Sequence, residues 1–254
     1  MSASARPSRV EVPTTPDELL TTTRSVRLRL DLSRPVDLDR VRECVEIALQ
    51  APNGGNTQRW HWLVVAEDGL RKRIAEVYRR SFEARYPPTV AADGASAGET
   101  SAIGASASGA SGDGASASGA AAGGVSDRML AGGRHLAEHL HEVPVLVIPC
   151  LELGSRRLTA ANQAGVWGSL LPAAWSYMLA ARARGLGTAW TTVHLDAEQE
   201  VADLLGLPGD VRQGALIPTA HVLGDGFGPA PRRPVDSVLH LDGWGGTGWG
   251  GGGA

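Results

Sequence analysis

The sequence predicts a protein of mixed helices and strands, and three observations support this class. Two stretches, 36–50 and 70–86, carry apolar residues at helical spacing. Two others, 60–65 and 143–151, are short apolar runs rich in β-branched residues, which is typical of strands. Between the first helix and the first strand stand Pro, Gly and Asn residues that require a sharp turn.

Composition limits the function classes. The 254 residues suffice for one large domain or two small ones, and a net charge of −3 gives no basic excess for nucleic acid. No apolar run approaches the roughly 18 residues of a membrane span. The two cysteines, Cys44 and Cys150, lie in apolar contexts and predict buried thiols without a disulfide framework. Since no apolar signal core precedes residue 16, we expect a cytoplasmic protein.

The N-terminal part begins with a Ser-, Thr- and Pro-rich segment, 1–16, which we predict to be a disordered lead. Pro16 opens a short helical turn with acidic residues near its start. Arg24, Ser25 and Arg27 follow as two cations with a hydroxyl between them, a compact group that suits an anion such as phosphate. A solvated basic surface is the alternative interpretation.

The first helix and the turn after it define the second candidate group. Asp37 can cap the helix that runs to residue 50, and Pro52 prevents its continuation. Gly54 and Gly55 would let a flat ligand lie close to the main chain. Asn56 and Gln58 offer amide donors and acceptors that suit the edge of a heterocycle, although a solvated loop has the same composition.

The middle of the chain contains a segment of a different kind. After the helix 70–86, which Pro87 and Pro88 end, residues 89–126 consist almost entirely of Gly, Ala and Ser. Such a segment cannot bury enough apolar surface to offset its ordering, so we predict a disordered insert. A flexible linker between two domains is the competing interpretation. The Gly-rich end, 243–254, is predicted to be disordered as well.

The next helix, 129–141, carries His135 and His139 four residues apart, a spacing that could hold a metal. The order of residues does not match a known zinc signature, so we favour a solvated helix face and predict no metal site. The strand 143–151 is apolar nearly throughout, which predicts burial on both faces.

The longest helical pattern is 159–184, with Pro172 expected to kink it. It is apolar on most sides and dotted with small residues, so we expect it to be buried and to form the core of a dimer interface. Gly185 ends it and a strand follows. A short helix over 196–205 and a strand over 213–223 complete the prediction.

Four motifs in order resemble those of the nitroreductase family. Ala51-Pro52-x-x-x-Asn56-x-Gln58-x-Trp60 before a strand resembles its A-P-S-x-x-N-x-Q-P-W segment. Arg24-Ser25-x-Arg27, Gly185-Leu186-Gly187-x-x-Trp190 and the late pair Arg232-Arg233 resemble three further elements. The chain departs from the family at Thr23, which replaces an Arg, at Arg59, which replaces a Pro, and at Thr191-Thr192. Arg59, where the family has a Pro, would place a cation near the ligand pocket that the resemblance implies.

The resemblance implies a three-layer α+β fold, with a central mixed sheet flanked by helices in an intertwined homodimer. One domain, 17–242, would contain the insert. The family binds FMN, and NAD(P)H would give a hydride to flavin N5 before a small acceptor such as a nitroaromatic or quinone is reduced. No side chain is assigned as acid or base. The implied cofactor-binding residues are Arg24, Ser25, Arg27, Pro52, Asn53, Gly54, Asn56, Trp190, Thr191, Thr192, Arg232 and Arg233.

Two other functions fit the same resemblance. One is a non-catalytic protein that binds or sequesters FMN, with the insert closing the site to nicotinamide. The other keeps the fold but changes the chemistry, to flavin destruction or to dehydrogenation of a peptide-derived substrate. These functions differ in the shape of the pocket, which the sequence does not reveal.

Overall fold

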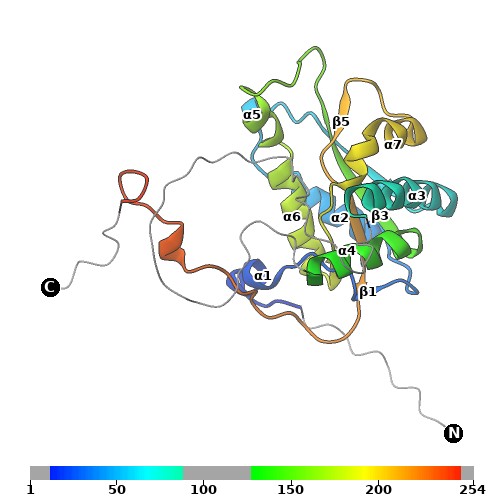
Figure 1. The fold of residues 1–254 in the computed structure, drawn as a ribbon, viewed down its shortest axis with the longest axis horizontal. Helices are drawn as coiled ribbons and strands as arrows, with labels where there is room; N and C mark the ends of the chain where they lie inside the picture. Colours follow the sequence, from blue (N-terminus) through cyan, green and yellow to red (C-terminus); the bar gives the residue numbers. More distant parts are fainter. Residues whose placement is uncertain (1–11, 88–126, 247–254) are drawn as a thin grey trace, which may run out of the picture.

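The computed structural model describes residues 12–87 and 127–246 (Figure 1). The predicted insert, 89–126, lies outside the described residues, as do most of the N-terminal lead and residues 247–254. No helix in the described ranges is long and apolar enough to cross a membrane.

A six-stranded sheet forms the centre of the fold. Its strands are β1 (Leu30–Asp31), β2 (Trp60–Val65), β3 (Val145–Glu152), β4 (Leu186–Thr188), β5 (Val211–Gln213) and β6 (Ile217–Val222). The order is β1-β6-β3-β2, with β4 paired to β6 and β5 to β3. Strand β3 is buried from Val145 to Leu151, which confirms the predicted burial on both faces.

The expected mixed sheet is instead antiparallel in all the ladders of the described residues. The only parallel pairing there is an isolated bridge between Ser25 and Thr188. One helix between two strands commonly gives a parallel pair, whereas two helices, α3 (Asp68–Arg85) and α4 (Asp127–His139), lie between β2 and β3. Both helices pack on the same face of the sheet, and β3 runs antiparallel to β2.

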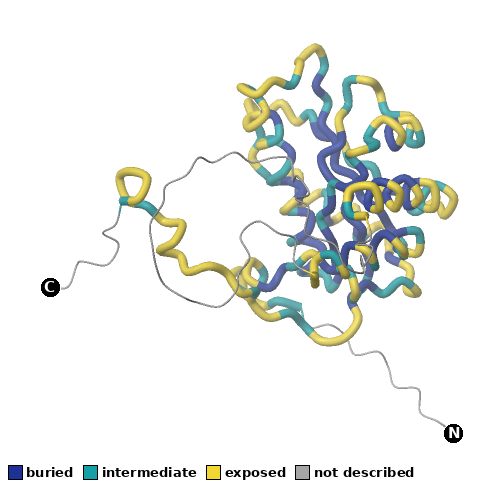
Figure 2. Tube along the Cα trace, viewed as in Figure 1, coloured by how far each residue is buried: buried dark blue, intermediate teal, exposed yellow. Residues whose placement is uncertain are grey.

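Helices cover both faces of the sheet and complete three layers. On one face, α2 (Leu38–Ala48) and α6 (Leu171–Arg182) pack against Val145 and Val147 of β3. On the other, α3, α4 and α7 (Glu198–Leu205) pack against Leu146 and Ile148. Because alternate residues of a strand point to opposite faces, β3 serves both cores. Figure 2 shows the buried positions concentrated between these layers.

The predicted helix starts are largely confirmed. Helix α1 (Pro16–Thr22) begins where expected, and α2 is capped by Asp37, whose carboxylate accepts the N–H of Asp39 at 3.0 Å. The predicted helix 129–141 is α4 followed by a 3-10 turn, η2 (Leu140–Glu142). The predicted short helix 196–205 is η3 (Val193–Ala197) followed by α7.

The prediction of one kinked helix over 159–184 is wrong. The structure has two helices, α5 (Gln163–Trp167) and α6, and Pro172 lies in the first turn of α6. A proline fits the first turn because the N–H it lacks has no partner in the helix there. The expected burial on all sides is also wrong within one chain, since Gly165 is exposed and Trp175 retains 38% of its accessible surface.

The predicted strand 213–223 is likewise divided, into β5 and β6. Gly214 lies between them, where a Cβ would come within 2.6 Å of the Leu170 side chain. Any larger residue would therefore collide with the segment that leads into α6.

After β6 the chain leaves the body as a C-terminal arm, residues 223–246, which includes η4 (Val235–Ser237) (Figure 1). Arg29 fixes the first residues of the arm, its root, to the body of the protein. Its guanidinium donates to the carbonyl oxygen of Leu223 at 2.8 Å and to that of Asp225. The Phe227 ring lies 4.3 Å from the Arg29 guanidinium and 5.3 Å from that of Arg182. Farther out, apolar side chains are exposed, with Trp244 at 96%.

Candidate functional site

Two of the predicted groups, remote in sequence, lie side by side. The backbone N–H of Trp190 donates to the Ser25 hydroxyl at 3.2 Å, and that of Val26 donates to the Thr188 carbonyl at 2.7 Å. The segment 24–27 is thus fastened along β4 and the residues after it. Gly187 of β4 has no room for a side chain, because a Cβ there would lie 2.6 Å from the Val222 side chain of the neighbouring strand β6.

Arg27, Trp190, Thr191 and Thr192 line one cavity of about 170 Å³. Its remaining wall comes from α3 and α4, and includes three aromatic side chains that no sequence motif marked as part of a site: Tyr78, Phe82 and Tyr86. Tyr78 and Phe82 lie four residues apart on one face of α3, and Tyr86 follows at the same spacing directly after the helix ends, so this spacing was the available signal.

Thr191 is held by the fold itself. Its hydroxyl lies 2.9 Å from the Tyr78 hydroxyl. Its backbone N–H donates to the Leu216 carbonyl oxygen at 3.1 Å, and its carbonyl oxygen accepts the Leu216 N–H at 2.9 Å. Burial raises the pKa of Tyr78, so this phenol stays protonated. The Thr191 hydroxyl therefore has an internal partner, and this residue sets the position of its neighbours Trp190 and Thr192.

The C-terminal basic element, which contains Arg232, lies near the N-terminal one, which contains Arg24. The Arg24 guanidinium donates to the carbonyl oxygen of Gly228, near the root of the C-terminal arm. Burial and the positive charge of Arg232 both lower the pKa of Arg24, so the two cations stand close enough to repel. Arg233 is exposed on the arm.

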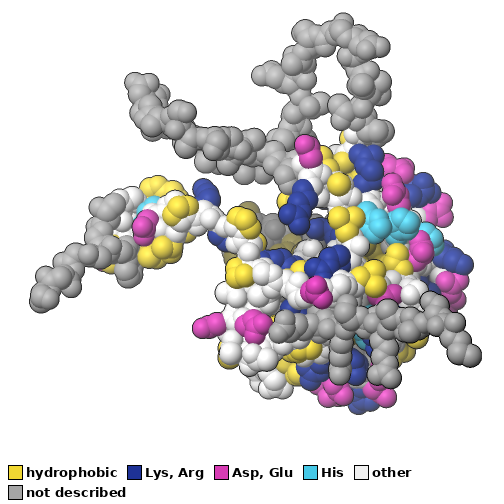
Figure 3. Space-filling view, turned by 90° about the horizontal axis from the view of Figure 1, so that it is seen from below, with side chains coloured by type: hydrophobic (Ala, Val, Ile, Leu, Met, Phe, Trp, Pro, Cys, Tyr) yellow, Lys and Arg dark blue, Asp and Glu magenta, His cyan; other side chains and the backbone are white. Residues whose placement is uncertain are grey.

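None of these arginines is neutralised by a carboxylate of the described residues. Within the described ranges, Arg24, Arg27, Arg232 and Arg233 have no carboxylate within 4.0 Å. Seen from below, basic side chains gather on this face of the molecule (Figure 3). Guanidinium groups without a protein counter-ion suit a phosphate, which each can bind through two hydrogen bonds.

The Asn56 loop, residues 52–58, is an exposed turn in which the side-chain amides form hydrogen bonds within the loop. It contains the 3-10 turn η1 (Gly54–Asn56). The Asn53 side-chain oxygen accepts the N–H of Gln58 at 3.0 Å, and that of Asn56 accepts the Gln58 amide at 3.2 Å. Ser169, just before α6, accepts the N–H of Gly54 at 3.0 Å.

The backbone of this loop is strained. Asn56 and Gln58 have φ of 51° and 49°, in the left-handed region that side chains disfavour, and Gly55 has 62°. Such conformations persist where the surroundings impose them and are common at ligand sites. Pro52 and Gly54 are exposed and Asn53 is half-buried, so the loop presents its face to the outside.

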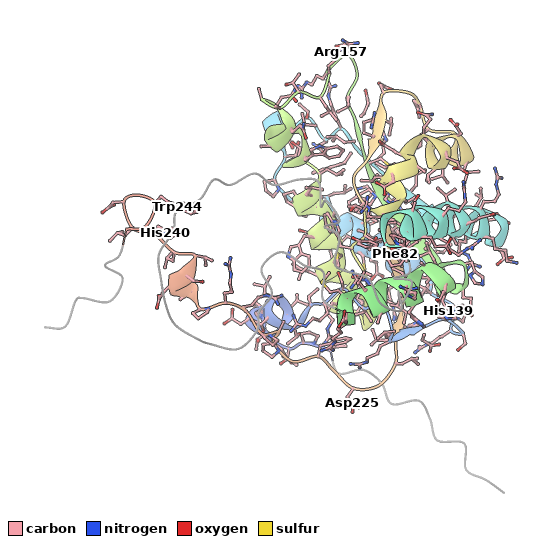
Figure 4. All side chains as sticks on the ribbon, viewed as in Figure 1. Phe82, His139, Arg157, Asp225, His240 and Trp244 are labelled. Atoms are coloured by element: carbon pink, nitrogen blue, oxygen red, sulfur yellow. The ribbon has the colours of Figure 1, made fainter. Side chains whose placement is uncertain are left out.

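The Asn56 loop and the arginine group lie at opposite ends of the sheet. Ser25 pairs with Thr188, whose row continues through β6 to Val145 of β3. Trp60, directly after the loop, pairs with Leu151, six residues farther along β3. At 3.2–3.4 Å per residue this separates the two groups by about 20 Å along the strands. Figure 4 shows Arg157, in the segment after β3, and Asp225, near the start of the arm, at opposite ends of the molecule.

The other candidate residues stay outside this site. Cys44 and Cys150 are buried free thiols, as predicted, and burial raises their pKa values to about 11 and about 12. The rings of His135 and His139 lie 4.5 Å apart on the surface of α4. In the part of the chain that the structure describes, no group of three or more metal-binding side chains occurs.

Comparison with known proteins agrees with this geometry. The sequence profile of the nitroreductase family matches residues 20–221. No curated protein matches the chain.

Several solved structures share the fold. A nitroreductase-like protein from Bacillus cereus is 15% identical, with a TM-score of 0.58, and the match covers 92% of this chain and 100% of that one. Iodotyrosine deiodinase bound to FMN and 3-iodo-L-tyrosine is 21% identical, with a TM-score of 0.57 and coverage of 89% and 98%. A BluB-like flavoprotein from Clostridium difficile is 16% identical, with a TM-score of 0.58 and coverage of 90% and 99%.

The profile spans most of the chain, and these structures have its three-layer fold. The chain belongs to the nitroreductase family.

Proposed function

We propose that the protein is an FMN-dependent oxidoreductase that passes electrons from NAD(P)H to a small acceptor such as a nitroaromatic or a quinone. The observation that carries this proposal is the hydrogen bond from Arg24 to the Gly228 carbonyl oxygen, which brings the C-terminal arm with Arg232 to the N-terminal arginines, none of which has a carboxylate partner in the described residues. Family membership and a structural relative that holds FMN support the choice of cofactor.

The residues fit such a cofactor. Arg24, Arg27 and Arg232 would bind its phosphate, with Arg233 as a further cation, and Ser25 would fix the neighbouring backbone at Trp190. Trp190 and Thr192 would border the ring system from the cavity they share with Arg27. FMN, when bound, supplies the two-electron chemistry. The chain's part is to orient the ring and to stabilise negative charge with its cations.

The separation within one chain supports a homodimer. Because the Asn56 loop lies about 20 Å along the sheet from the arginine group, we infer that Pro52, Asn53, Gly54 and Asn56 contact the flavin bound by a second copy. Each site would then need both chains. The exposed sides of α5 and α6, including Trp175, supply apolar surface for this contact. We propose the cytoplasm as the compartment, where reduced nicotinamide nucleotides are available.

Two measurements test the function. Denatured protein should release FMN rather than FAD, and the holoprotein should oxidise NADH or NADPH when menadione or nitrobenzene is present. FMN binding without nucleotide oxidation would instead favour the sequestering protein. Breakdown of the flavin itself, or dehydrogenation of a peptide, would favour an enzyme of the same fold with different chemistry.

A mixing experiment tests the shared site. Arg24→Ala damages the part of the site that binds the phosphate, and Gly54→Trp damages the loop that the other chain contributes. In a dimer with one chain of each variant, both changes fall in the same site, so the second site should be intact and active. The control is each variant mixed with itself, which should show little activity at an FMN concentration that fills only intact sites. No recovery after confirmed exchange of subunits would show that each site is built from one chain.

A further inference from the structure

Two arginines outside the predicted FMN site stand beside the Asn56 loop. Arg59 precedes β2, and Arg156 lies in the turn after β3. Arg156 lines a hollow of about 390 Å³ together with Gly54, Gly55 and Gly165. A small cleft that contains Arg59 adjoins this hollow, and four residues line both: Thr57, Arg156, Val166 and Ser169.

The charge of these arginines has no partner in the described parts of the chain. Neither has a carboxylate within 4.0 Å. The Arg59 guanidinium makes one long hydrogen bond, 3.4 Å, to the carbonyl oxygen of Leu153. Glu152 also borders the cleft, but its carboxylate lies 3.5 Å from the His61 ring instead. Arg157 follows Arg156 and adds positive charge at this end of the molecule (Figure 4).

The size and lining of the hollow suit a small molecule. Its wall contains Ala161 and three glycines, and a Cβ added to Gly165 would meet nothing within 4 Å. Its volume falls within the range of about 300–1,000 Å³ typical of small-molecule sites. The polar atoms of Ser169 and Asn162 already bond to Gly54 and to the 157–159 backbone, so the free donors belong to the arginines.

We propose that Arg59 and Arg156 form an anion-binding subsite that receives a carboxylate or phosphate of a substrate. Guanidinium groups bind both oxyanions through paired hydrogen bonds. The assignment to a substrate rests on the proposed function, since the Asn56 loop beside the hollow would meet the flavin of a second copy. The oxyanion would come from the carboxylate of an aromatic acceptor or from a phosphate of the nicotinamide nucleotide.

Binding to the purified holoprotein tests the subsite without any turnover. Isothermal titration with 4-nitrobenzoate and with 2′,5′-ADP covers the two sources, and 4-nitrobenzyl alcohol and adenosine are the matched neutral probes. Loss of one charge-assisted interaction should weaken the anionic probe about ten- to a hundredfold in Arg59→Ala and Arg156→Ala. The neutral probes should be unaffected. Arg156→Lys should restore part of the affinity, and Arg157→Ala, which alters an arginine outside the hollow, is the control.

The results separate the possibilities. Weakening of 4-nitrobenzoate alone assigns the subsite to the acceptor, and the KM for that acceptor should rise with it. Weakening of 2′,5′-ADP alone assigns it to the nucleotide. Selective weakening in a protein that oxidises no NAD(P)H would keep the anion site and reject the proposed reaction. The subsite would be overturned if folded Arg59→Ala and Arg156→Ala each bound both anionic probes as tightly as the wild type does. It would also be overturned if the wild type bound neither anion.

Discussion

Acidification should destabilise the protein through one buried histidine, His194. The side chain in η3 is fully buried, and neither ring nitrogen has a hydrogen-bond partner among the described residues. Burial lowers its pKa to about 4; the charge of Asp196 opposes this shift and that of Arg85 adds to it. The ring is therefore neutral in the folded protein at neutral pH.

The magnitude follows from the difference between the two states. The ordinary histidine pKa of 6.5 applies to the unfolded chain, so the unfolded chain binds a proton first as the pH falls. The contribution of neutral His194 is fully present above pH 6.5 and is lost as the pH approaches 4. Since each pKa unit corresponds to about 1.4 kcal/mol, the loss is about 3 kcal/mol.

The assay is urea unfolding of the wild type and of His194→Phe across this pH range. Carboxylates titrate in both proteins, so the difference between their two pH profiles isolates His194. We expect the wild type to lose about 3 kcal/mol more than the variant. Parallel profiles of wild type and His194→Phe would refute the reasoning.

Two further predictions follow from the described contacts. Arg24→Ala and Arg27→Ala should each weaken FMN binding about ten- to a hundredfold, measured by quenching of flavin fluorescence, and unchanged affinity in both would remove them from the site. Cys44 and Cys150 should resist thiol reagents at pH 8 in the native protein, because burial raises their pKa values to about 11 and about 12. Rapid labelling without denaturant would contradict their burial.

The sequence predicted the local elements well where one signal dominated. The strand 60–65 was expected with the bounds that β2 has, because a turn rich in Gly and Asn precedes an uninterrupted apolar run. Asp37 likewise marked the start of α2 correctly, whereas the helix ends at Ala48, two residues before the expected end at Gln50. The division of 159–184 was missed because helical periodicity continues through Gly168, and the role of Pro172 depends on where the first turn of α6 begins.

The assembly of the site could be predicted only in part. Motif order indicated the arginines and the Asn56 loop, but their separation depends on strand register, which the sequence does not reveal. The Tyr78–Thr191 hydrogen bond joins α3 to the segment after β4, and no local pattern predicts such a contact. The mixed sheet came from the resemblance alone, whereas β2 and β3, which have the two helices α3 and α4 between them, pair antiparallel.

Anaerobic stopped-flow mixing of the yellow holoprotein with NADH, and separately with NADPH, tests the central claim most directly. The proposed function predicts that the visible absorbance of bound FMN bleaches with at least one nucleotide and returns when menadione is added. A holoprotein with one FMN per site that neither nucleotide bleaches would contradict an NAD(P)H-dependent oxidoreductase.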